Sequence, residues 1–484
     1  MTDSKENRSV WTSAFVVLVV AFFTYFNGFD KPNSVFWDEN YHIASSQKYI
    51  DGVMYKEPHP PLGKLLMALS ESLSGLNSDI DKSGFSKTDY IKKFPEGYQF
   101  KAVRLPSALM ATLSALVFYL ILYNLSNHSL LSLLFSSMYL FENALIVHSR
   151  SAMLEGIQIL FLLLSILMFL KMRQKRDIKS YVWLGIWIGL AVAVKLNALI
   201  MILLLPFLFL YEYNAEEKLT SLKKWFVGSV VSVTALIAVF SAVFYIHIAL
   251  GKNIPTHKDY EMSPMYKSVL EKGESANIKH LFPLIVENLK FTASYSKNVP
   301  HYDPCKKGEN GSLFSTWPFL NKTINYRWEK SDGKVKYLYL MGNPVIWFGA
   351  FLGVLLSFVL VVAKFVFGLR VEKESFIPIA LFVTLYLSYM IVMFKIERVM
   401  YLYHYFLPLL FSMFASFALF VHIFRENVEN IGKNKLFLGA LFILVAQVVY
   451  AFWFFSPFTY YEALSSQEFH LREWFEFWKL KAIL

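Results

Sequence analysis

The residues best suited to chemistry lie in one short stretch, "FWDENYH" at residues 36–42. Asp38 and Glu39 stand side by side among aromatic residues, directly after a long apolar run. A carboxylate at such an apolar boundary, near basic groups, is well placed to act as a general base. The plain alternative is a pair of solvated loop acids, which is the usual state of exposed carboxylates. We predict that Asp38 and Glu39 are catalytic.

A second group of ionisable residues follows in "HPPLGKLL", which contains His59 and Lys64. The two prolines stiffen the chain between them. His42 lies four residues after Asp38, on the same face if this stretch is helical, so a metal site of Asp38, Glu39 and His42 is an alternative. Since no further cluster has metal-ligand spacing, we expect neither a metal nor another cofactor.

Several basic residues lie at the ends of apolar runs, on what we predict below to be the outer side. They are Arg104, Arg150, Lys195, Lys395 and Arg398. Charges there are costly unless they reach water or find a partner, and reaching water explains only one or two of them. The set therefore predicts an anionic ligand such as a phosphate. For Glu142 and Glu155, pairing with Arg150 or another base and a direct role are equally open.

The composition defines the class of protein. The chain has 484 residues, of which 56% are hydrophobic, 18% aromatic and 17% charged, which is too apolar for a soluble protein. The net charge of +11 resides mostly in short connections such as "KMRQKRDIK" at residues 171–179, so we expect no nucleic acid partner. Neither a phosphate-binding glycine loop nor a dinucleotide-binding glycine motif is present. Cys305, the single cysteine, excludes an internal disulfide.

Apolar runs of about 20 residues predict an all-α polytopic membrane protein. We expect eleven spans: 11–29, 103–123, 129–147, 152–170, 180–194, 196–212, 225–250, 344–368, 376–394, 402–424 and 436–456. The first has no small-residue cleavage site after it, so we interpret it as a retained helix. Basic connections then fall on one side if the N-terminus is cytoplasmic, and the C-terminus is external.

This topology leaves two long segments outside, residues 30–101 and 251–342. Within the first, "PLGKLLMALSESLSGL" has apolar residues near helical spacing and predicts an amphipathic helix on the outer leaflet. We expect no separate β domain. The predicted organisation is a catalytic membrane module over 1–250, the second external segment over 251–342, and a C-terminal membrane region with an external tail over 343–484.

Together these motifs resemble the protein O-mannosyltransferase family, within the wider C-type architecture of multi-span glycosyltransferases. "FWDENYH", "HPPLGKLL", "AVRLPSAL", "FENALIVHSRSAMLEG", "GLAVAVK", "GNPVIWF" and "RVMYLYHYFLP" fit the family in order and span nearly the whole chain. The external segment over 251–342 is too short for the β-trefoil domain of the eukaryotic members. The sequence is therefore similar to the bacterial branch, which implies a cell-membrane location with the site on the external side.

The resemblance implies an inverting transfer of mannose from a polyprenyl phosphate to serine or threonine hydroxyls of translocated proteins, without a metal. The lipid bilayer and the protein translocation machinery are both expected partners. The catalytic aspartate of the family falls on Asp38 and its second acid on Glu39. The residues expected to bind the phosphate or the substrate are His59, Lys64, Arg104, Arg150, Lys195, Lys395, Arg398 and His404.

Two rival functions share these features. Another polyprenyl-phosphate sugar transferase, acting on a lipid or polysaccharide, would have the same helices, acids and bases but a different acceptor groove. A transporter or channel would line an ion path with such charges. The broken helices expected at matching positions in two halves of a transporter are missing from the sequence.

Overall fold

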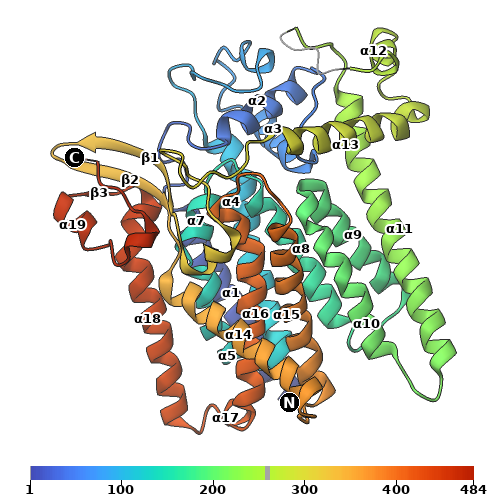
Figure 1. The fold of residues 1–484 in the computed structure, drawn as a ribbon, viewed down its shortest axis with the longest axis vertical. Helices are drawn as coiled ribbons and strands as arrows, with labels where there is room; N and C mark the ends of the chain where they lie inside the picture. Colours follow the sequence, from blue (N-terminus) through green and yellow to red (C-terminus); the bar gives the residue numbers. More distant parts are fainter. Residues whose placement is uncertain (1, 257–261, 484) are drawn as a thin grey trace.

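Long helices lying side by side form the body of the protein (Figure 1). The computed structural model describes residues 2–256 and 262–483, with side chains from residue 8 onward. Within that part, seven helical segments are long and apolar enough to cross a membrane. They are α1 (Thr2–Phe26), α4 (Lys101–Ser126), α11 (Lys218–Leu250), α14 (Pro344–Val366), α15 (Lys373–Phe394), η5 with α16 (Leu402–Tyr405, Phe406–Ile423) and α18 (Lys435–Tyr460). The predicted polytopic membrane fold is therefore confirmed.

The other predicted spans fall on shorter or broken helices. Those helices are α5 (Ser129–Phe135), α6 (Ser137–Leu140), α7 (Asn143–Ser149), α8 (Glu155–Lys171), α9 (Ile178–Val194), η2 (Leu196–Leu203) and α10 (Leu204–Glu212). The segment 129–149 is an eighth candidate span, bent by 62° where α7 begins. Because α8 and α9 have 17 residues each, they are short for a complete crossing. The count of eleven spans is therefore not confirmed.

The polar segments gather at one end of the bundle. Helices α2 (Glu39–Ile50), α3 (Leu62–Ser74), α12 (Pro264–Glu271) and α13 (Leu281–Asn298) lie there, whereas the N-terminus and α17 (Arg425–Glu429) lie at the other end (Figure 1). The predicted amphipathic helix is α3, which buries Met67 and exposes Leu73. It ends at Gly75, whose positive φ of 63° is a conformation that glycine adopts without strain. Short 3₁₀ turns η1, η3, η4 and η6 span Phe85–Lys87, Ile278–His280, Phe314–Phe319 and Glu476–Trp478.

A small antiparallel sheet corrects the all-α prediction. Strands β1 (Ile324–Ser331) and β2 (Lys334–Leu340) form a hairpin, and β3 (Ala463–Leu464), followed by α19 (Ser466–His470), adds to its edge. The two-residue turn is Asp332-Gly333, with φ of 50° and 75°. Positive φ at both positions matches the right-handed twist of the strands, which makes Asp-Gly a strong hairpin signal. This signal was present in the sequence, inside the predicted second external segment.

Close helix packing positions one end of the site. Helix α9 lies against α11, and a Cβ atom added at Gly185 would lie 2.1 Å from the backbone oxygen of Ser232. Only a residue without a side chain permits this approach. Helix α9 ends at Val194, and Lys195 follows in an extended conformation before η2. The packing of α9 thus fixes where the Lys195 side chain begins.

Cys305 provides a direct test of the predicted orientation. It is exposed in the second external segment and is the only cysteine of the chain. A membrane-impermeant maleimide should therefore label it in intact cells, because an exposed thiol reacts once the reagent reaches it. The matched control is a Lys175→Cys, Cys305→Ser variant, whose new thiol lies in the predicted cytoplasmic connection and should react only after the cells are opened. Labelling of both from outside would contradict the topology.

Candidate active site

Asp38 lies at the polar end of the bundle, and its carboxylate has no hydrogen-bond partner among the described residues. Asp38 directly precedes α2 without capping that helix. Four charged or chargeable side chains influence it: Glu155, Lys195, His148 and Lys64. Burial, with the nearby Glu155 carboxylate, raises the pKa of Asp38 to about 6. A carboxylate in this state can take a proton near neutral pH.

Glu39, its neighbour in the chain, has hydrogen-bond donors of the protein on both carboxylate oxygens. It is fully buried and forms a two-pronged ion pair with Arg104, with Nε to Oε1 at 2.7 Å and Nη2 to Oε2 at 2.8 Å. The backbone amides of Phe36 and Ala152 donate to the same carboxylate. Such a satisfied ion pair fixes the loop before α2 to the start of α4.

Arg104 is held by several groups of the protein. It is completely buried, and its guanidinium donates to the carbonyls of Pro32 and Ser34 as well as to Glu39. In this structure Glu39 and Arg104 therefore serve as each other's partners. The catalytic role of Glu39 and the phosphate contact of Arg104 stay predictions.

Beside Asp38 lies a second, mixed cluster built from α7, α8 and the residue after α9. Glu155 accepts from Lys195 Nζ at 2.5 Å and shares a 2.8 Å hydrogen bond with His148 Nε2. His148 Nδ1 in turn bonds the Tyr326 hydroxyl at 2.7 Å. The open question for Glu155 is thus answered by an ion pair with Lys195. His148 and Tyr326 were missed, although His148 lies inside the quoted "NALIVHSR" stretch.

Glu142 and Arg150 do not pair with each other. Glu142 accepts hydrogen bonds from two backbone amides and from Trp347 Nε1 at 2.8 Å. Arg150 donates to the carbonyls of Asn27, Gly28 and Thr459, and its guanidinium lies 4.6 Å from the centre of the Tyr460 ring. Arg150 therefore ties the end of α1 to the end of α18, and its phosphate contact stays a prediction.

The "HPPLGK" residues reach the same end of the bundle. His59 is partly buried, and burial together with the nearby Lys195 charge holds its pKa well below the usual range. A neutral imidazole can donate one hydrogen bond and accept another. Lys64 is fully buried and pairs with Glu57. Among the residues that the structure describes, no side-chain hydrogen bond holds His59, whereas Lys64 is held by a carboxylate.

The last predicted residues come from the connection between α15 and η5. Arg398 is partly buried, its Nε has no hydrogen-bond partner among the described residues, and its charge acts on His59 and His404. Helix α15 ends at Phe394, so Lys395 and Arg398 do not share a helical face. Lys395 is exposed, with its ammonium 5.6 Å from the Phe394 ring centre. His404 stacks on Tyr403 at 4.6 Å between ring centres.

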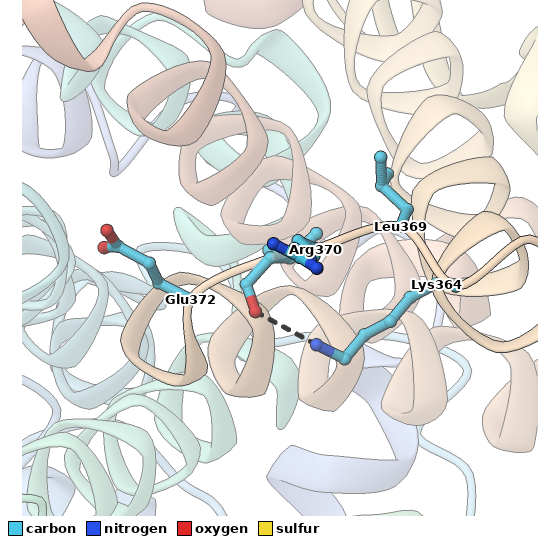
Figure 2. A pocket seen from close by; sticks show the side chains of 6 residues that line it. Lys364, Leu369, Arg370 and Glu372 are labelled. Atoms are coloured by element: carbon cyan, nitrogen blue, oxygen red, sulfur yellow. Dashed lines mark hydrogen bonds between the residues drawn. The ribbon is translucent and has the colours of Figure 1, made fainter.

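Neither of two other possible sites competes with Asp38. Among the described residues, no three His, Cys, Asp or Glu side chains are grouped as metal ligands, so the Asp38–Glu39–His42 alternative has no support. A cavity of about 550 Å³ lies at the connection between α14 and α15, near α17. Figure 2 shows the side chains that line it. There Lys364 donates to the Val371 carbonyl and Glu372 pairs with Arg425. This cavity lies at the opposite end of the bundle from α2 and thus from Asp38 (Figure 1).

The fold and the site define a multi-pass membrane protein with its chemistry at one polar end. Two family models match: "Dolichyl-phosphate-mannose-protein mannosyltransferase" over residues 15–250, and "C-terminal four TMM region of protein-O-mannosyltransferase" over residues 291–478. Together they cover most of the sequence. The chain belongs to the protein O-mannosyltransferase family.

Individual relatives agree with this assignment. Protein O-mannosyl-transferase 1 of Danio rerio is 27% identical over 53% of this chain and 36% of its own length. Dolichyl-phosphate-mannose–protein mannosyltransferase 1 of Candida albicans is 24% identical over 51% and 29%. The matches thus span about a third of these relatives' lengths. The fold is similar to a chain of the S. cerevisiae Pmt1-Pmt2 complex bound to the sugar donor, with a TM-score of 0.81, 15% identity, and coverage of 97% of this chain and 92% of that one.

The buried Glu39–Arg104 pair predicts a large loss of stability when one partner is removed. Arg104→Ala leaves a buried carboxylate without its counter-ion, which costs about 3–5 kcal/mol. We expect a clearly lower thermal unfolding temperature in detergent, partly restored in the Arg104→Ala, Glu39→Gln double variant. The matched control is Lys101→Ala, which breaks the exposed Lys101–Asp30 pair of 3.3 Å at the start of the same helix and should change little. Equal losses for both single variants would contradict this role.

Proposed function

We propose that this protein transfers mannose from a polyprenyl-phosphate donor to serine or threonine hydroxyls of translocated proteins, on the external face of the membrane. Membership of the family supports the reaction class, and the printed names of the relatives describe mannose transfer to protein. The observation that carries the proposal is the contrast between two adjacent acids. The Asp38 carboxylate accepts no hydrogen bond from the described residues and has a raised pKa, whereas Glu39 forms an ion pair with Arg104.

In this mechanism Asp38 is the general base. A hydroxyl is a poor nucleophile, so it needs a carboxylate to take its proton as its oxygen attacks the anomeric carbon of mannose. The bond between that carbon and the phosphate oxygen breaks as the new bond forms on the opposite face, which inverts the configuration. The proton resides on Asp38, and the leaving polyprenyl phosphate carries the bonding electrons.

The leaving phosphate needs positive charge where its own charge develops. Lys64 and Lys195 are each held by a glutamate, and Arg104 and Arg150 are held within the protein. Arg398 is the basic side chain near His59 that lacks an ion-pair partner in the described part of the chain, so we assign the phosphate chiefly to Arg398. His59, a neutral donor, and His404 complete this proposed phosphate site.

Transfer itself is tested with purified protein, radiolabelled polyprenyl-phosphate mannose and a serine- and threonine-rich peptide. We expect label on the peptide, and retained label on the lipid would contradict the proposal. A polysaccharide or lipid acceptor that is labelled in place of the peptide would support the related sugar transferase instead. We further propose a cell-membrane location, a cytoplasmic N-terminus, and translocation machinery as the source of acceptors.

Asp38→Asn should lower turnover by roughly 10²–10⁴, because the amide keeps the size of the side chain but cannot accept the proton. Donor binding should change little. The measurement is the initial rate of peptide labelling at saturating donor. Glu39→Gln is the matched comparison, since the same change one residue away acts on the loop and should also lower the unfolding temperature. An Asp38→Asn rate within twofold of wild type would remove Asp38 as the base.

Arg398→Ala should weaken donor binding strongly, and Arg398→Lys should restore it only in part, because a point charge replaces a two-pronged donor. The readout is thermal stabilisation of the well-folded variant by polyprenyl-phosphate mannose, since a ligand that binds the folded state raises its stability. Lys395→Ala removes an exposed cation three residues earlier and should retain stabilisation. If Arg398→Ala is stabilised as strongly as wild type, Arg398 does not hold the phosphate.

A further inference from the structure

Tyr326 contacts the loop that carries Asp38 from the predicted second external segment, next to Arg327, whose Nη1 donates to the Val35 carbonyl of that loop at 3.3 Å. Tyr326, a buried residue of β1, stacks on Phe36 at 5.7 Å and lies against Trp37 at 5.2 Å between ring centres. Its hydroxyl bonds His148 Nδ1 at 2.7 Å. One side chain thus joins the hairpin, the loop before α2, and α7.

The backbone of β1 is irregular at this residue. Asn325 pairs with Tyr339 and Arg327 pairs with Leu338, so Tyr326 is an extra residue between two consecutive partners on β2. A bulge of this kind changes the direction of a side chain relative to the regular alternation of the strand, and such bulges often occur beside active sites. The bulge accounts for how a residue of a surface hairpin comes to contact Trp37 and His148.

The loop itself also has an unusual conformation. Trp37 has a φ of +52°, a left-handed conformation that is strained for a bulky residue and persists only when surrounding contacts enforce it. Its ring lies edge-on to Tyr401 at 5.2 Å and to Tyr403 at 6.3 Å, in addition to its contact with Tyr326. These rings fix the residue that directly precedes Asp38.

We propose that Tyr326 is a positioning residue, whose ring holds Trp37 and whose hydroxyl holds His148, so that Asp38 stays aimed beside the Glu155–Lys195 pair. This inference rests on the proposed mannosyl transfer. Tyr326 acts on Asp38 through Trp37, and on Glu155 through His148, which shares a hydrogen bond with Glu155 at 2.8 Å. The second external segment thereby completes the site without supplying a reacting group.

The surroundings of Asp38 predict how its pKa changes when the contacts of Tyr326 are weakened. The ionisable groups that face it are Lys64 of α3, His148 of α7, Glu155 of α8, Lys195 after α9, Tyr41 of α2, Tyr326 of β1, and Tyr401 and Tyr403 at η5. Burial is the largest cause of the raised pKa of Asp38. Loss of either Tyr326 contact, including the hydroxyl bond to His148, should let water reach Asp38 and return its pKa toward its ordinary, lower value.

The test variant is Tyr326→Phe, which keeps the ring and removes only the hydroxyl. Tyr337→Phe is the matched control, because Tyr337 is also buried in the hairpin but its hydroxyl accepts a hydrogen bond from Ile483 N at 2.8 Å. For Tyr326→Phe we expect kcat to fall roughly tenfold with an unchanged donor KM, because a misplaced base slows the chemical step without weakening binding. Tyr337→Phe should behave as wild type. Equal rates for both variants, or equal losses in both, would overturn the positioning role.

A second readout does not depend on activity. In pH-difference infrared spectra, the Asp38 carboxyl band is identified by its absence in Asp38→Asn. This band should titrate at lower pH in Tyr326→Phe than in wild type, and unchanged in Tyr337→Phe. An unshifted titration in Tyr326→Phe overturns the inference. A shifted titration in a protein that labels no peptide would instead support the positioning role and contradict the proposed function.

Discussion

The site depends on the buried ion pair between Glu39 and Arg104. Burying a carboxylate is costly unless it is paired and hydrogen-bonded. Glu39 has a complete set of donors, namely the Arg104 guanidinium and two backbone amides. The pair anchors the start of α2 to the start of α4, and Asp38 is left as the carboxylate that can change its protonation state.

The basic residues also divide into those that have partners within the protein and one that does not. Lys64 and Lys195 are neutralised by glutamates, and Arg150 is enclosed by backbone carbonyls, so each of these costly charges is compensated within the protein. Arg398 is different, because in the described part of the chain its guanidinium forms neither an ion pair nor a hydrogen bond, whereas that of Arg150 donates to three carbonyls. A partly buried guanidinium without a partner of its own can bind an anion such as the phosphate of the proposed donor. The cations thus differ in whether the protein itself supplies their partners.

The sequence predicted the class of fold, the acid pair and most of the charged residues around it, since apolar runs and short motifs are local features. Only the family resemblance separated Asp38 from Glu39. The residues alone could not, because the partner that decides between them, Arg104, lies on another helix. The Asp332-Gly333 hairpin was readable but was overlooked in a chain dominated by helical signals. The role of Tyr326 could not be predicted from the sequence, because its bulge arises only when β1 pairs with β2. Contacts between distant segments decide which charges are free, and the sequence does not display them.

The most direct test of the central claim is the pH dependence of kcat/KM for peptide mannosylation. With Asp38 as an unoccupied base whose pKa is raised to about 6, activity should be constant at neutral pH and fall with decreasing pH through about 6, as the carboxylate becomes protonated. Glu155→Gln removes the neighbouring negative charge that raises this pKa, so the fall should move to lower pH. An activity that falls only near about 4, where an ordinary aspartate titrates, and that Glu155→Gln leaves in place, would contradict the account.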